Sequence, residues 1–120
     1  MDNHSKHEAD ALYLAWKLQN DGPRAAQKIR RRLSSGETRQ LYRLRSWVIV
    51  RGEVQALLSP AVSLDRIATS IWDDGSQPIS SRWVPCDECA KIVRDMETAP
   101  VSMGLADRPE QWPWSSAATH

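Results

Sequence analysis

At 120 residues the chain suits a single domain with a hydrophobic core, and its 26% charged and 41% hydrophobic residues are typical of a globular protein. Two cysteines three residues apart argue against a disulfide-stabilised fold, and no apolar run approaches the roughly 20 residues of a membrane helix. The N-terminus lacks the character of a signal peptide, so we expect a soluble, cytoplasmic protein with no membrane partner.

The formal net charge of +1 conceals an uneven distribution of charge along the chain. Acidic residues gather in the second half, whereas the stretch from Pro23 to Arg45 holds basic residues opposed only by Glu37. These basic residues are Arg24, Lys28, Arg30, Arg31, Arg32, Arg39, Arg43 and Arg45. A surface with two charged poles predicts an anionic partner for one of them.

The first half of the chain alternates between strand and helix patterns. Alternating apolar residues predict a strand over residues 11–18, which the turn sequence Asn20-Asp-Gly-Pro23 ends. From Arg24 the apolar spacing becomes helical, and we expect Ser34-Ser-Gly36 to stop or interrupt this helix. Within residues 44–60, two apolar runs joined at an Arg-Gly break predict a strand–turn–strand unit.

The second half continues the pattern with two more helices and one strand. Ser63 is placed to cap a helix that extends to Trp72, and a turn-rich connection follows over residues 73–78. Residues 79–84 form a plausible fourth strand. A third helix begins near Cys89, and we expect it to end before Pro100.

This order of elements predicts an α+β fold of the ferredoxin-like, split βαβ class (β-α-β-β-α-β), extended by a C-terminal helix and an irregular Trp-Pro-Trp tail. We expect one domain over residues 1–120, with a flexible N-terminus over residues 1–10 and the tail over residues 104–120.

Glu53-Val54-Gln55 is the most informative triplet of the chain. It lies in the second strand of the central unit, where Glu53 and Gln55 point to one face and Val54 to the other. Two polar side chains on one face of an apolar strand are costly unless they are exposed, paired or used in function.

Several segments, in order, resemble the REP-associated tyrosine transposases of the IS200-like family. Residues 97–116 contain Pro-Val-Ser-Met-Gly-Leu and Arg-Pro-Glu-Gln-Trp-Pro-Trp-Ser-Ser, which are similar to the family's Asn-Pro-Val-x-x-Gly-Leu-Val and Arg-Pro-Glu-x-Trp-Pro-Trp-Ser-Ser. Residues 12–23, 47–60 and 62–67 look like the family's first strand, hairpin and following helix. The resemblance spans nearly the whole chain and is strongest at the C-terminus.

The resemblance implies a single-strand DNA nuclease in which two histidines, separated by one apolar residue, hold a divalent metal. A tyrosine on a following helix attacks the phosphorus, so the chemistry needs both a metal and a nucleophile. In this chain Glu53 and Gln55 occupy the histidine positions, and the only tyrosines, Tyr13 and Tyr42, both precede that site. The departures indicate a catalytically inactive, repurposed transposase-like domain from a bacterial or phage-encoded mobile element.

Two alternatives for the triplet stay open. The first alternative is a residual Mg²⁺-dependent nuclease that uses Glu53 and Gln55, because glutamate binds Mg²⁺. The other is a purely structural role, in which both side chains hydrogen-bond Arg51, Arg82 or backbone groups.

Cys86-Asp-Glu-Cys89 and His4-Ser-Lys-His7 are two half-sites with zinc-ligand spacing. In a split βαβ sheet the last strand lies antiparallel beside the first, which would bring both half-sites to one place. The alternative is that Cys89 is a small core residue and that no metal or cofactor binds.

Trp112 and Trp114 have two interpretations as well. They fit a role in locking the tail onto the domain, and one of them fits stacking on an unpaired base.

The function that follows is binding of hairpin or single-stranded DNA, with the eight basic residues from Arg24 to Arg45 and Arg51 contacting phosphates. The main alternative is a protein-interaction factor that acts on a host complex.

Overall fold

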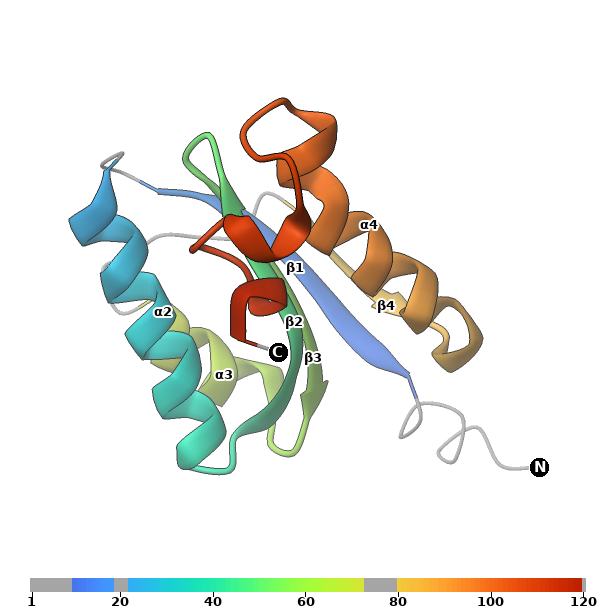
Figure 1. Ribbon diagram of the computed structural model, residues 1–120. Helices are drawn as coiled ribbons and strands as arrows, with labels where there is room; N and C mark the ends of the chain where they lie inside the picture. Colours follow the sequence, from blue (N-terminus) through green and yellow to red (C-terminus); the bar gives the residue numbers. More distant parts are fainter. Residues whose placement is uncertain (1–9, 19–21, 73–79, 120) are drawn as a thin grey trace.

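The computed structural model describes residues 10–18, 22–72 and 80–119 (Figure 1). The strands in chain order are β1 (Ala11–Lys17), β2 (Tyr42–Val50), β3 (Glu53–Pro60) and β4 (Ser80–Val84). The helices are α2 (Pro23–Thr38), α3 (Leu64–Ile71) and α4 (Cys89–Ser102), with short 3₁₀ turns at Cys86–Glu88, Pro109–Gln111 and Ser116–Thr119. Within these ranges, no helix is both long enough and apolar enough to cross a lipid bilayer.

The four strands form one antiparallel sheet with the order β2-β3-β1-β4. Each of the crossovers through α2 and α3 skips one position in the sheet, as the split βαβ topology requires. The predicted α+β, ferredoxin-like fold is therefore confirmed. Ala11 pairs with Val84, so the start of β1 and the end of β4 are neighbours, as expected.

Helices cover both faces of the sheet (Figure 1). One face carries α2 and α3 over a core that includes Leu14, Trp16 and Leu58. The other face carries α4, whose Cys89 and Met96 pack with strand residues in a second, smaller cluster. The members of this second cluster are Ala11, Val48, Val50, Leu57, Val84, Cys89 and Met96.

The first helix does not stop at Ser34-Ser-Gly36, as the sequence suggested, but continues to Thr38. Gly36 is buried there because the Tyr42 ring lies directly on it, and a Cβ atom at this position would collide with the ring. The Tyr42 hydroxyl donates a hydrogen bond to Leu33 O at 2.8 Å. Glycine therefore serves close packing and not helix termination at this point.

The last helix also extends beyond its expected end, because it contains Pro100 and finishes at Ser102. A proline in the last turn removes only one backbone donor. The helix ends in a Schellman arrangement, in which Leu105 N donates to Pro100 O and Gly104 N donates to Val101 O. Gly104, with φ of 74°, is the residue that ends the helix.

The C-terminal tail covers the free edge of β2. Ile49 N donates to Trp114 O at 2.8 Å, and Trp112 Nε1 donates to Ile49 O at 2.8 Å. Trp47 N donates to Ser116 Oγ at 3.1 Å. The prediction that the tryptophans lock the tail onto the domain is confirmed, and an exposed sheet edge is closed at the same time.

Candidate nucleic-acid interface

The outer face of α2 carries several exposed basic side chains. The helix buries Ala26, Leu33 and Gly36 along one stripe, which leaves the opposite stripe to solvent. Arg24, Lys28 and Arg31 are exposed on that stripe, and none of them forms an ion pair with the part of the chain that the structure describes.

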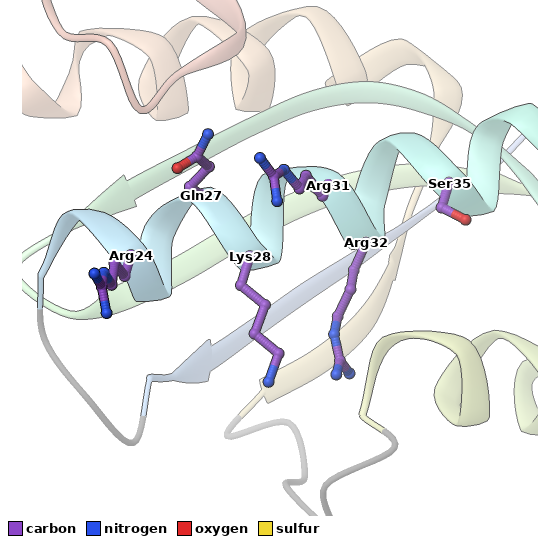
Figure 2. A pocket seen from close by; sticks show the side chains of 6 residues that line it. All are labelled: Arg24, Gln27, Lys28, Arg31, Arg32 and Ser35. Atoms are coloured by element: carbon purple, nitrogen blue, oxygen red, sulfur yellow. The ribbon is translucent and has the colours of Figure 1, made fainter.

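These side chains surround a shallow hollow of about 620 Å³. Figure 2 shows Lys28 and Arg32 extending to the same side of the helix, whereas Gln27 and Arg31 lie along its other edge. The hollow is lined by Arg24, Gln27, Lys28, Arg31, Arg32 and Ser35. Guanidinium and ammonium groups with nearby amide and hydroxyl groups are the donors that phosphate oxygens accept from.

Arg32 differs from its neighbours because it also joins two helices. Its Nη1 donates to Ile71 O at 3.1 Å, at the C-terminal end of α3. A cation near helix carbonyls that lack partners within the helix is favourable. Arg32 therefore contributes to the packing of α2 against α3 as well as to the charge of the surface.

The other predicted phosphate contacts do not all share this face. Arg30 is exposed on the flank of α2 that also carries Glu37, whose carboxylate accepts from Leu44 N of β2 at 2.9 Å. Arg39 lies at the C-terminal end of the helix. The basic cluster in the sequence is thus spread around α2 and not confined to one stripe.

Arg43, Arg45 and Arg51 lie away from α2. Arg43 alternates along β2 with residues that pack beneath α2, so its side chain is on the other side of the strand. Arg45 is exposed at the bulge between Leu44 and Ser46. Arg51 lies in the β2–β3 turn, where Nη2 approaches Met103 O at 3.5 Å.

A second hollow, of about 440 Å³, lies between the end of α2 and the exposed side of α3. It is lined by Arg39, Leu41, Asp65, Arg66, Thr69 and Ser70. The sequence interpretation did not include Arg66 among the phosphate contacts. The sequence places Arg66 off the apolar stripe of α3, which predicts that it is exposed. A single exposed arginine does not by itself predict a phosphate contact, and its position beside the same hollow as Arg39 appears only in the structure.

Glu53 and Gln55 lie on the sheet face opposite to α2. Val54 packs beneath α2 and α3, so its two neighbours point to the face that carries α4. Both are half-buried, and Gln55 Nε2 donates to Glu53 Oε2 at 3.2 Å. The structural alternative from the sequence had both side chains bonding Arg51, Arg82 or backbone groups, whereas the hydrogen bond that the structure describes joins the two side chains to each other.

Tyr13 and Arg82 lie on this same face, on β1 and β4. The Arg82 guanidinium carbon is 5.3 Å from the centre of the Tyr13 ring, a cation–π distance. Burial raises the pKa of the Tyr13 hydroxyl, and the Glu53 carboxylate raises it further, against the opposing effect of Arg82. The neutral phenol is therefore favoured at this position.

Neither tyrosine lies on a helix. Tyr42 is buried on the α2 side of the sheet, on the opposite face from Glu53, and burial raises its pKa well above the usual value. An activated oxygen nucleophile needs a lowered pKa or an adjacent base. The pKa values of both tyrosines are raised instead, which disfavours the nucleophilic phenolate.

The cysteines differ in exposure. Cys89 is buried in the cluster beneath α4 and donates weakly to Pro85 O at 3.5 Å, whereas Cys86 is exposed. His4 and His7 lie outside the described residues, so the zinc site stays a prediction. Among the residues that are described, no three side chains of the Cys, His, Asp or Glu types lie together as a metal-binding group.

Comparison with known proteins shows the fold. No protein-family model and no curated protein matches the chain. Its structure is similar to that of a REP-associated tyrosine transposase bound to a REP hairpin, with a TM-score of 0.66 and 13% sequence identity. The match covers 90% of this chain and 76% of the transposase chain.

Proposed function

We propose that this chain binds structured or single-stranded DNA through the outer face of α2 and that it does not cleave the DNA. The observation that carries the proposal is the row of exposed Arg24, Lys28 and Arg31, which no acidic side chain of the described residues pairs with. Phosphate neutralisation by such residues dominates the affinity of most DNA-binding proteins. The hairpin bound to the structurally similar transposase supports DNA as the partner.

The arrangement on the other face of the sheet supports the absence of cleavage. Gln55 and Glu53 hydrogen-bond each other, and the phenol near them, Tyr13, has a raised pKa. A nuclease of the tyrosine type needs two metal ligands and a nucleophile. The chain is therefore proposed to retain the fold of a transposase without its reaction.

Binding is tested by fluorescence anisotropy with a labelled DNA hairpin over a salt series. We expect affinity to fall steeply as salt rises, and the triple variant Arg24→Ala, Lys28→Ala, Arg31→Ala to lose about three units of the salt slope. Arg94→Ala, an exposed arginine on α4, is the matched control and leaves the slope unchanged. Absence of binding at low salt would refute the proposal.

Inactivity is tested separately with end-labelled hairpin and single-stranded DNA in Mg²⁺ and Mn²⁺. We expect neither shortened DNA nor a covalent protein–DNA product on a denaturing gel. Cleavage by the wild-type protein that disappears in Glu53→Ala would establish the residual metal-dependent nuclease instead.

A further inference from the structure

The two basic hollows belong to a single layer of helices. Ala61 N donates to Leu41 O at 2.9 Å just before α3, and Ile71 O accepts from Arg32 at its end. α3 therefore runs back beside α2, as Figure 1 also shows. Its exposed Arg66 lines the same hollow as Arg39, which lies at the C-terminal end of α2.

The layer has a strong positive charge. Residues 23–39 and 64–71 hold seven basic and two acidic side chains, the acidic ones being Glu37 and Asp65. Glu37 is turned toward β2, where it accepts from Leu44 N. At a helical rise of about 1.5 Å per residue, the length of α2 from Arg24 to Arg39 is about 22 Å. One strand of B-form DNA carries about six phosphates over that length.

The layer offers no aromatic side chain for stacking on bases. Neither α2 nor α3 contains a tryptophan, tyrosine, phenylalanine or histidine. The described aromatic residues elsewhere are mostly occupied: Trp112 bonds Ile49 O, Trp72 packs edge-on against Trp16, and Tyr13 lies against Arg82. Trp83 on β4 is the most exposed of the described aromatic residues, at 39%.

A basic surface without aromatic side chains favours duplex DNA over unpaired strands. Proteins that hold unpaired strands combine a positive groove with aromatic rings on which the bases stack. Contacts to a duplex backbone need only cationic groups and donors such as hydroxyls. The layer provides these, with the hydroxyls of Ser35 in the first hollow and Ser70 in the second, whereas the Thr69 hydroxyl donates to Asp65 O within α3.

We infer that the ligand of this surface is the sugar–phosphate backbone of base-paired DNA, held across α2 and α3 together, with Arg66 and Arg39 extending the contact beyond α2. The inference rests on the proposed DNA binding and narrows it to a duplex stem. Asp65 lies inside the contact and opposes it.

The experiment compares three labelled probes over one salt series: a blunt duplex, a hairpin with the same stem, and a single strand of equal length that cannot pair. We expect the duplex and the hairpin to bind equally well and the single strand about tenfold more weakly. For the duplex, Arg66→Ala reduces the salt slope by about one unit. Asp65→Asn raises the affinity, because it removes a negative charge from the contact, and Arg94→Ala on α4 changes nothing.

The outcomes separate the two proposals. If none of the three probes binds, DNA binding itself is wrong. If the single strand binds as tightly as the duplex, or if Arg66→Ala and Asp65→Asn both leave duplex binding unchanged, DNA binding stands and the inference about α3 and the duplex is overturned.

Discussion

Gly36 in α2 is required by Tyr42, a residue of β2 whose ring occupies the space that a side chain at position 36 would need. Alanine normally stabilises a helix interior by about 1 kcal/mol relative to glycine. Here the methyl group would collide with the Tyr42 ring, so we expect Gly36→Ala to lower the free energy of unfolding by about 1–3 kcal/mol. Denaturant unfolding followed by circular dichroism measures the change.

Two controls make this prediction specific. Ser35→Ala, at the exposed neighbouring position, is expected to be neutral or slightly stabilising. In a Tyr42→Ala background the collision is removed, and Gly36→Ala then stabilises the helix. A destabilisation by Gly36→Ala that persists without the Tyr42 ring would contradict the explanation.

The two tyrosines are expected to make the fold less stable at alkaline pH. Folded-state pKa values of Tyr13 and Tyr42 are raised above the usual value of 10.0, so the unfolded chain loses these protons first. Their contribution to stability is complete below about pH 10 and falls as pH rises through the folded-state values.

This pH dependence is measured by urea unfolding at a series of pH values from neutral to strongly alkaline. We expect the free energy of unfolding to fall above about pH 10. The decline becomes shallower in Tyr13→Phe, which removes one of the two groups. An identical decline in the wild type and in Tyr13→Phe would show that Tyr13 does not titrate with a raised pKa.

At the scale of elements, the tail is part of the sheet's construction. Ser116 is buried where β2, α4 and the tail meet: its Oγ accepts from Trp47 N and is 2.8 Å from Glu97 Oε2. Ser116→Ala leaves a buried backbone donor and a carboxylate without this partner. We expect a loss of about 1–3 kcal/mol in the free energy of unfolding.

Amide hydrogen exchange checks the mechanism of this loss. Trp47 N and Ile49 N, which bond the tail, are expected to exchange faster in Ser116→Ala, while amides in the β1–β3 ladder change only with global stability. Glu110→Ala, an exposed change in the same tail, serves as the control. Unchanged exchange at Ile49 would mean that the tail is held without Ser116.

The order of elements and the sheet could be predicted because alternation and helical spacing are local properties of the sequence. The Ser63 cap and the end of α3 at Trp72 could be predicted as well, but the C-terminal ends of α2 and α4 could not. Gly36 continues α2 because Tyr42 returns to it in space, and Pro100 is accepted in α4 because Gly104 ends the helix just beyond it. Such contacts depend on the tertiary fold.

For the candidate site, too, local features could be predicted from the sequence and tertiary contacts could not. Clustered arginines in the sequence predicted a basic surface, and the exposed row on α2 agrees with it. That Arg43 would leave this face, and that Arg66 would join Arg39, depends on how β2 and α3 pack. Alternation along β3 places Gln55 and Glu53 on one face, but it does not tell which polar neighbour each side chain bonds.

At the scale of the molecule, the two charged poles of the sequence become two opposite layers. The α2–α3 layer is strongly basic, whereas residues 86–111, which include α4, hold six acidic and three basic side chains. The sheet lies between them (Figure 1). DNA approaching the protein is therefore attracted to one layer and repelled by the other, which orients the encounter.

The range of this orienting effect can be tested through salt. A helix is about 10 Å across and helix and sheet layers pack about 10 Å apart, so charges on the outside of α4 lie roughly 20 Å or more from the outside of α2. The Debye length is about 30 Å at 0.01 M ionic strength and about 8 Å at 0.15 M.

Neutralising the exposed acids Asp87 and Glu88 should therefore raise the association rate with DNA at low ionic strength only. Arg31→Ala, which removes one of the proposed phosphate contacts, is expected to weaken binding at both ionic strengths. Stopped-flow association with a labelled hairpin distinguishes the two effects, and an Asp87→Asn, Glu88→Gln variant that binds faster at 0.15 M would place DNA on the α4 layer as well.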